Sequence, residues 1–312
     1  MMAGQDIFIN NAEVHFRVAS GVVRAIDQVS VRFVAGKITG LIGESGCGKS
    51  ILGLSILGLL PPYAHVTGDI LYGGMHILSA SRKELRALRG RNIGFIPQSP
   101  AESLNTVRRV GSQLDEALRL VEKNSERRWQ RALDLLRGFG FGDPERIMRA
   151  YPFELSGGMQ QRVLCAIGVC CSPNWVMADE PTKGLDKALC DQVRETLLSL
   201  RSFGVDSMLV ITHDLDLAEN LCDVIAIMYA GQIVEIGERV LENPRHPYTQ
   251  AYLSALPRNG MRPIDGIPPA PWDEFPGCRF APRCGYATGR CRMECPGAYT
   301  GASGMVRCFQ YA

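Results

Sequence analysis

The fold of this chain is decided by a short glycine-rich stretch, Gly43-Glu44-Ser45-Gly46-Cys47-Gly48-Lys49-Ser50. An apolar run at 38–42 precedes it and predicts a strand, and the run at 51–60 predicts a helix. This pattern in this context is typical of a phosphate-binding loop. Glycines let the backbone fold around an anion, and the helix start points its N–H groups at the same anion. An ordinary glycine-rich turn is the competing interpretation, which the complete pattern disfavours.

Two carboxylates at the end of an apolar run suit the chemistry of this loop. Trp175–Ala178 leads directly into Asp179 and Glu180. Asp179 can hold Mg²⁺, and Glu180 can accept a proton from an attacking water. A strand that simply exits into a loop would look the same. Together with Lys49, for the β- and γ-phosphates, and Ser50, for Mg²⁺, the pair predicts hydrolysis of a magnesium nucleotide.

Length and composition set wider limits. The 312 residues suit one large domain with an appendage, or two domains. A hydrophobic content of 46% and a charged content of 21% are ordinary for a globular chain, and a net charge of +2 gives no support for a polyanion-binding surface. No apolar run reaches the ~18 residues that span a bilayer. The start lacks the features of a signal peptide, so we expect a cytoplasmic protein with any membrane role held by a partner.

A second distinctive stretch is Leu155-Ser156-Gly157-Gly158-Met159-Gln160-Gln161-Arg162. Ser156 can cap a helix, and the two glycines leave backbone N–H groups open to an anion. A plain capped helix start is the alternative. One chain rarely needs two phosphate cradles for one nucleotide, unless the second serves a nucleotide held by another subunit.

In their order, these motifs resemble the ATP-binding subunits of ABC transporters, on residues 43–50, Gln98, 155–162, 175–180, Asp186 and His213. The stretch 155–162 is nearly diagnostic of that superfamily. The resemblance implies an α/β fold, a P-loop ABC ATPase core with a RecA-like mixed sheet, an antiparallel β subdomain, a helical subdomain and a small Cys-rich C-terminal tail. We expect an ATP-binding domain at 1–257, with the helical subdomain at about 99–172, and the Cys-rich domain at 258–312.

The resemblance also implies roles for single residues. Two such subunits would enclose two ATP molecules head to tail, each with Mg²⁺. The implied catalytic residues are Lys49, Gln98, Glu180 and His213, and the implied Mg²⁺ ligands are Ser50, Gln98 and Asp179. Nucleotide contacts would come from 43–50, Ile51, Phe16 and Asp186, and from Ser156 and Gly158 reaching across to the partner's ATP. Phe16 would stack on adenine, and a place in the core is its alternative.

Three further stretches resemble the oligopeptide/dipeptide/nickel importers: 98–100 followed by 103–105, then 243–249, and 266–269 followed by 277–284. This implies import of peptides, nickel or a metal chelate through two membrane permease subunits, with an extracytoplasmic solute-binding protein. The chain would lie on the inner face of the cell membrane. Met159 stands where partner subunits often carry Gln. The chain therefore resembles the first of two homologous ATPase subunits that form a heterodimer. Thr182–Leu185 departs from the usual run of small residues, which predicts that the two ATP sites are not equivalent.

Five of the eleven cysteines crowd into the tail. In a cytosolic chain such a cluster suggests metal before disulfides. Cys278, Cys284, Cys291 and Cys308 form a four-thiolate set, with Cys295 in excess, and the spacing fits neither zinc ribbons nor the common ferredoxin patterns. The tail resembles that of family members proposed to hold an iron–sulfur cluster. A [4Fe–4S] cluster, zinc and reduced thiols all stay open.

Two other classes of function compete. A soluble ABC ATPase acting on nucleic acid or ribosomes usually carries two ATPase domains or long insertions. The single ATPase unit and the near-neutral charge argue against this class, and we expect no nucleic acid partner. A nucleotide-binding module without hydrolysis finds its only support in the altered loop at Lys183 and Gly184.

Overall fold

The computed structural model describes residues 5–19 and 21–312, which form two compact units. The first unit contains Gln5, 34–38 and 80–217, and the second contains 6–33, 39–79 and 218–312. Residues 1–4, part of the start that predicts no signal peptide, lie outside the described residues. Both units are therefore assembled from segments that are distant in sequence.

Three parallel strands form the sheet of the first unit, in the order β8-β7-β6. Ile96 pairs with Ala178 across β6 and β7, and Asp179 pairs with Ile211 across β7 and β8. Every residue of β7 and β8 is buried, as expected for strands of a parallel sheet covered on both faces. This register brings the carboxyl ends of the three strands to one edge. The strands are β6 (Ile93–Ile96), β7 (Trp175–Asp179) and β8 (Ser207–Thr212).

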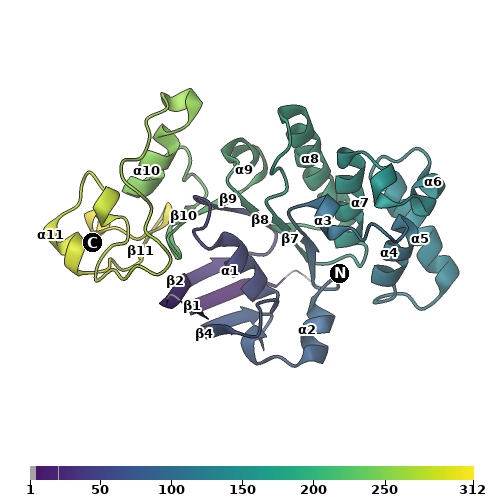
Figure 1. The fold of residues 1–312 in the computed structure, drawn as a ribbon, viewed down its shortest axis with the longest axis horizontal. Helices are drawn as coiled ribbons and strands as arrows, with labels where there is room; N and C mark the ends of the chain where they lie inside the picture. The colour runs from purple at the N-terminus through teal and green to yellow at the C-terminus, as the bar shows by residue number, and fades with distance from the viewer. Residues whose placement is uncertain (1–4, 20) are drawn as a thin grey trace. The chain divides into compact units, whose positions relative to one another are not determined.

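A group of helices separates β6 from β7 in the sequence. Within it α4 packs against α5, α6 and α7 (Figure 1). Side-chain caps start these helices where the sequence offers Asn, Asp or Ser, as at Asn124, Asp143 and Ser156. The helices of this unit are α2 (Arg82–Leu88), α3 (Pro100–Ser103), α4 (Val110–Leu118), α5 (Ser125–Gly138), α6 (Pro144–Arg149), α7 (Gly157–Val169) and α8 (Lys187–Ser199), and α9 (Leu215–Leu221) follows β8. Of the helices in 5–19 and 21–312, none combines the length and apolarity needed to cross a bilayer.

The second unit holds two sheet regions. One is antiparallel, in the order β2-β1-β4-β5, and α1 contacts β2 and β4 (Figure 1). In the other, β3 pairs in parallel with β9, and β9, β10, β12 and β11 continue as antiparallel neighbours. The elements are β1 (Ile7–Val18), β2 (Gly21–Phe33), β3 (Ile38–Ile42), α1 (Lys49–Ile56), β4 (Ala64–Tyr72), β5 (Met75–His76), β9 (Val224–Tyr229), β10 (Gln232–Gly237), α10 (Pro247–Ser254), α11 (Gly289–Met293), β11 (Tyr299–Gly301) and β12 (Gly304–Val306).

The Cys-rich tail builds on the core of this unit. Its β12 pairs with β10, where Glu235 faces Val306. Phe280 and Val306 are 2% and 0% exposed. The tail thus buries only a few apolar side chains, in a core that other segments supply, whereas Ile267, Trp272 and Met293 stay exposed.

Candidate functional site

The phosphate-binding loop lies between β3 and α1, as the sequence predicts. A Cβ on Gly43 would lie 2.1 Å from the Met228 carbonyl oxygen, and one on Gly48 would lie 2.3 Å from the Ala25 carbonyl oxygen. Gly48 also has a φ of +107°, which side chains rarely adopt. It is the N-cap of α1, so no side chain stands between the helix start and an incoming anion. Both glycines are therefore fixed by close backbone contacts.

Lys49 folds back onto its own loop. Its Nζ donates to the Gly43 carbonyl at 2.8 Å and to the Glu44 carbonyl at 3.0 Å, and the residue is 5% exposed. Burial raises the pKa of the neighbouring Cys47 thiol to about 11, against the opposing effect of Lys49, so this thiol is neutral near pH 7. The loop thus holds one buried cation beside the helix start, a suitable arrangement for phosphate.

Glu180 and His213 meet at the edge of the sheet in the first unit. The register of β7 and β8 sets them side by side, with His213 Nδ1 2.5 Å from Glu180 Oε2. Glu180 has a φ of +47°, and its N–H donates to the Ile211 carbonyl at 2.7 Å. Its side chain is 10% exposed and that of His213 is 47% exposed. A strained backbone on a nearly buried carboxylate is typical of a functional position.

The other carboxyl-edge candidates follow the same strands. Asp179 ends β7 and is 9% exposed. Gln98 is half-buried and lies two residues beyond the end of β6, whose Ile96 is level with Ala178. The structure therefore groups Gln98, Asp179, Glu180 and His213 at one edge of one parallel sheet, where α/β proteins commonly place their ligands.

The signature stretch begins a helix, as predicted. The exposed Ser156 caps α7 by accepting a hydrogen bond from the Met159 N–H at 3.4 Å, and Gly158 is half-buried in the first turn. Asp186 caps α8 through the Leu189 N–H at 3.0 Å. Ser156 and Asp186 therefore each cap a helix within the single chain. Their contact with a second subunit stays a proposal.

Phe16 lies on β1 and is half-buried. Its ring packs edge-to-face with Tyr63, with 6.0 Å between centroids, and Tyr63 is 67% exposed. Phe16 is therefore not fully buried, and its stacking on adenine stays a prediction.

The four cysteines expected to act together line one cavity of about 270 Å³ in the second unit. Its wall contains Cys278, Cys284, Cys291 and Cys308, whereas Cys295 is exposed and does not line it. No group of three potential ligands in 5–19 and 21–312 is close enough to hold a single metal ion. The four thiols thus line one common space, and their occupation by a cluster or by zinc stays a prediction.

The thiols of this cavity are mostly neutral. Burial raises the pKa of Cys278 to about 11 and also raises the pKa values of Cys284 and Cys308. At Cys291 burial is outweighed by hydrogen bonds with Thr288, which lower the pKa of this thiol. A bound metal would have to displace these protons.

Sequence reasoning missed contacts from the tail to the phosphate loop. Arg283 Nη1 lies 3.2 Å from both carboxylate oxygens of Glu44, and the Glu44 N–H donates to the Tyr248 hydroxyl at 3.2 Å. Tyr248 stands in the 243–249 stretch and Arg283 beside Cys284. The available signal in the sequence was weak: the short tail contains an arginine and is too small to fold without packing on the ATP-binding domain.

Comparison with known proteins decides the family. Residues 26–183 match the family described as ABC transporter, and residues 234–291 match the family described as oligopeptide/dipeptide transporter, C-terminal region. The chain belongs to the ABC transporter ATP-binding proteins. It is 40% identical to the dipeptide transport ATP-binding protein DppD of Escherichia coli, over 92% of this chain and 91% of that protein. It is 38% identical to the oligopeptide transport ATP-binding protein AppD of Bacillus subtilis, over 97% and 96%.

Solved structures confirm the fold of this ABC ATPase. The dimeric ATP-binding cassette MJ0796, in a post-hydrolysis state with ADP and phosphate, aligns with a TM-score of 0.65 at 24% identity, over 74% of this chain and 98% of that one. The structure of cbiO1 from Clostridium perfringens aligns with a TM-score of 0.64 at 23% identity, over 82% and 97%. The predicted α/β class is thereby confirmed. The family match confirms the predicted ATPase activity, and ATP with Mg²⁺ fits the loop described above.

Proposed function

We propose that this ABC ATPase powers the import of peptides through separate membrane permease subunits, from the cytoplasmic face of the cell membrane. The observation that carries the proposal is the similarity to DppD along nearly the whole chain, tail included. Nickel or a metal chelate, the other substrate class implied by the sequence resemblance, has no support from these relatives and is the second candidate. An ATPase acting on nucleic acid or ribosomes is not favoured by these relatives.

The proposed mechanism divides the site residues between two nucleotides. Lys49 binds the β- and γ-phosphates, and Ser50 and Asp179 hold Mg²⁺. Glu180 takes a proton from the attacking water, while His213, already beside it, contacts the γ-phosphate. Phe16 stacks on adenine. Gln98 contacts Mg²⁺ and the attacking water and faces the permease subunits.

A second, homologous ATPase subunit completes the sites. Ser156 and Gly158 present the start of α7 to the ATP of this partner, and Asp186 contacts the partner directly. Binding of ATP closes the dimer, and hydrolysis opens it. In the intact system a solute-binding protein delivers the substrate to the two permeases on the other side of the membrane.

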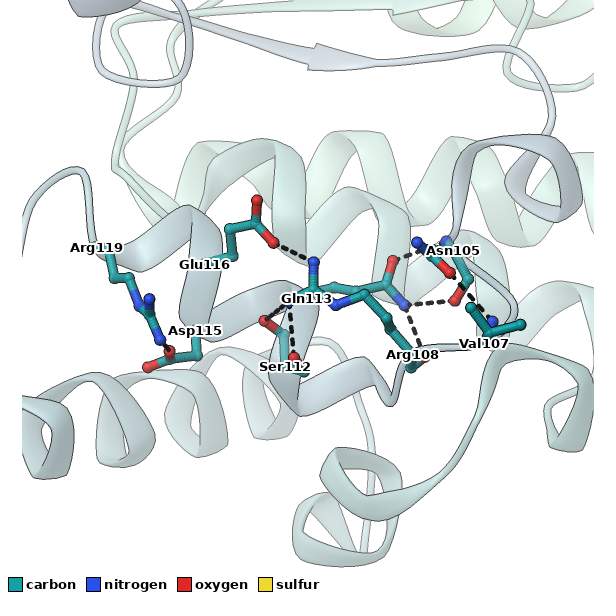
Figure 2. A network of polar contacts seen from close by, with 8 residues as sticks. All are labelled: Asn105, Val107, Arg108, Ser112, Gln113, Asp115, Glu116 and Arg119. Atoms are coloured by element: carbon teal, nitrogen blue, oxygen red, sulfur yellow. Dashed lines mark hydrogen bonds and ion pairs between the residues drawn. The ribbon is translucent and has the colours of Figure 1, made fainter.

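The segment after Gln98 supplies the proposed surface for the permeases. Figure 2 shows the Gln113 side chain holding the loop before α4: it accepts from the Asn105 N–H at 2.9 Å and donates to the Asn105 and Arg108 carbonyls at 3.1 and 3.0 Å. Asn105 in turn accepts from the Val107 N–H at 3.1 Å. Val107 is thus presented on a fixed loop with 81% of its surface exposed. Such an ordered apolar side chain suits a protein–protein contact.

The permease contact can be tested with two matched substitutions. Val107→Glu should abolish copurification with the permeases, because it introduces a charge at an apolar contact. Val121→Glu is the control, at another exposed valine of the same helical region, 40% exposed. Equal recovery of permeases with both variants would refute the proposed surface.

The cavity of the tail is proposed to hold a [4Fe–4S] cluster on Cys278, Cys284, Cys291 and Cys308. Four cysteine thiolates are the usual ligands of such clusters. A bound cluster would supply cross-links to a tail that has little core of its own. Zinc is the alternative occupant.

The metal content decides between these occupants. Protein purified without oxygen should contain iron and acid-labile sulfide. Cys284→Ser should lose both, whereas Cys295→Ser, outside the cavity wall, should retain them. Zinc in place of iron and sulfide, or no metal in the native protein, would contradict the cluster.

The substrate class can be tested on the complete transporter. ATP hydrolysis by the ATPase pair with its permeases and solute-binding protein should rise when dialanine is added and stay at its basal rate with nickel chloride. Stimulation by nickel alone would overturn the peptide assignment.

A further inference from the structure

A short segment of the tail, Cys278–Cys284, contacts the phosphate-binding loop although the two are far apart in sequence. Arg283 and Glu44, which form an ion pair at 3.2 Å, are separated by 239 positions. The side chains are 5% and 22% exposed, so little water competes for the contact. Two further hydrogen bonds fix the guanidinium: Nε donates to the Asp265 carbonyl at 3.1 Å and Nη1 to the Tyr229 hydroxyl at 3.3 Å.

A second arginine of the segment contacts residues outside the loop, one of them in a turn that is hydrogen-bonded to it. Arg279 lies 2.8 Å from the Asp27 carboxylate and donates to the Ala230 carbonyl. The next residue in that turn, Gly231, donates its N–H to the Cys47 carbonyl at 2.9 Å. The tail therefore also supports the turn that is hydrogen-bonded to the loop.

One of the three residues between the two arginines, Phe280, makes a third set of contacts with the surroundings of the loop. Phe280 is 2% exposed and packs its ring against Tyr229 and Tyr248, at 5.3 and 5.4 Å between centroids. Tyr248 accepts the hydrogen bond from the Glu44 N–H. Both the backbone and the side chain of Glu44 are thus held by groups that the tail positions.

We propose that the Cys278–Cys284 segment is a positioning element of the ATP site and that Arg283 holds Glu44 so that the loop is preformed for phosphate. The Glu44 carbonyl is also one of the two carbonyls that accept from Lys49, which connects the ion pair to the lysine that binds phosphate. When the loop is in its phosphate-binding conformation for only part of the time, the measured affinity for ATP is reduced to that fraction of its full value. The proposal rests on the ATP site alone and does not require a cluster in the tail.

The test measures the dissociation constant of a fluorescent ATP analogue with Mg²⁺ on the full chain. Arg283→Met should raise this constant by roughly tenfold, since it removes a charge-assisted contact that is largely buried. Arg239→Met is the matched control: its guanidinium pairs with Glu242 at 3.9 Å on the surface, with 81% of the side chain exposed, and it should leave the constant unchanged. A native dissociation constant for Arg283→Met would overturn the proposal.

Two more variants separate positioning from general destabilisation of the tail. Arg283→Lys keeps a cation near Glu44 and should bind the analogue within about threefold of the native chain. Glu44→Gln should also weaken binding of the analogue. The double variant Glu44→Gln with Arg283→Met should bind no less tightly than the more affected single variant, because each substitution removes the same ion pair. Independent, multiplying effects in this cycle, or no rescue by lysine, would contradict the role of the ion pair.

Discussion

The buried His246 makes the stability of the second unit sensitive to acid. It is 2% exposed, and its Nδ1 accepts a hydrogen bond from the Tyr248 N–H at 3.0 Å, which caps α10. Burial lowers the pKa of His246 to about 3, against a hydrogen bond with the Arg307 backbone that raises it. A proton on Nδ1 would also remove the acceptor that caps the helix. Folding therefore requires the neutral ring.

The sign and size of the effect follow from linkage. The folded-state pKa lies below the ordinary value of about 6.5, so between these values the unfolded chain binds a proton that the folded chain does not. The contribution of His246 is complete well above pH 6.5 and is lost as the pH falls towards 3. Between pH 7 and pH 4.5 the loss is about 2.5 kcal/mol, from two pH units at about 1.4 kcal/mol each less the small part already lost at pH 7.

Urea unfolding at pH 7 and pH 4.5 measures this term. His246→Asn keeps a capping acceptor without the titration, so its free energy of unfolding should fall by about 2.5 kcal/mol less than that of the native chain over this interval. His65→Asn, at an exposed position of β4, is the control and should follow the native chain. If His246→Asn loses as much stability on acidification as the native protein, the buried neutral histidine is not the cause.

Two further predictions concern catalysis and the loop. Glu180→Gln should lower the rate of ATP hydrolysis at least ~100-fold while leaving ATP affinity unchanged, as expected for loss of a general base. Phosphate-release assays measure this rate, with Glu195→Gln at an exposed position as the control. Undiminished turnover would exclude Glu180 as the base. Gly43→Ala should abolish ATP binding, because its Cβ would lie 2.1 Å from the Met228 carbonyl oxygen, whereas Gly297→Ala, with nothing within 4 Å of its Cβ, should bind ATP normally. Calorimetric titration with MgATP compares the two, and retained binding by Gly43→Ala would contradict the tight packing.

Local chemistry made much of the site predictable. The phosphate loop is recognisable because its glycines, lysine and serine must stand at fixed intervals between a strand and a helix. The meeting of Glu180 with His213 follows from strand ends, since two parallel strands in register bring the residues that follow them together. The cap of α7 was similarly visible as Ser156 ahead of a helical pattern, whereas the cap of α8 by Asp186 was not predicted.

Long-range packing accounts for what the sequence could not predict. Arg283 contacts Glu44 across 239 positions, and no periodicity or motif encodes such a partner. The tail hairpin of β11 and β12 is equally hidden, because three-residue strands that join an existing sheet at β10 lack the alternation of a longer strand. Strand β2 also begins as early as Gly21 because it pairs with β1 along its length, which local composition does not reveal.

The central claim is that ATP hydrolysis at this site drives peptide import. The most direct measurement uses vesicles that contain the permeases, the solute-binding protein and both ATPase subunits, supplied with labelled dialanine and MgATP. The native chain should accumulate the dipeptide only when ATP is present, and the Glu180→Gln variant should not accumulate it. Accumulation that is unchanged in the variant, or uptake of nickel with no uptake of the peptide, would contradict the account.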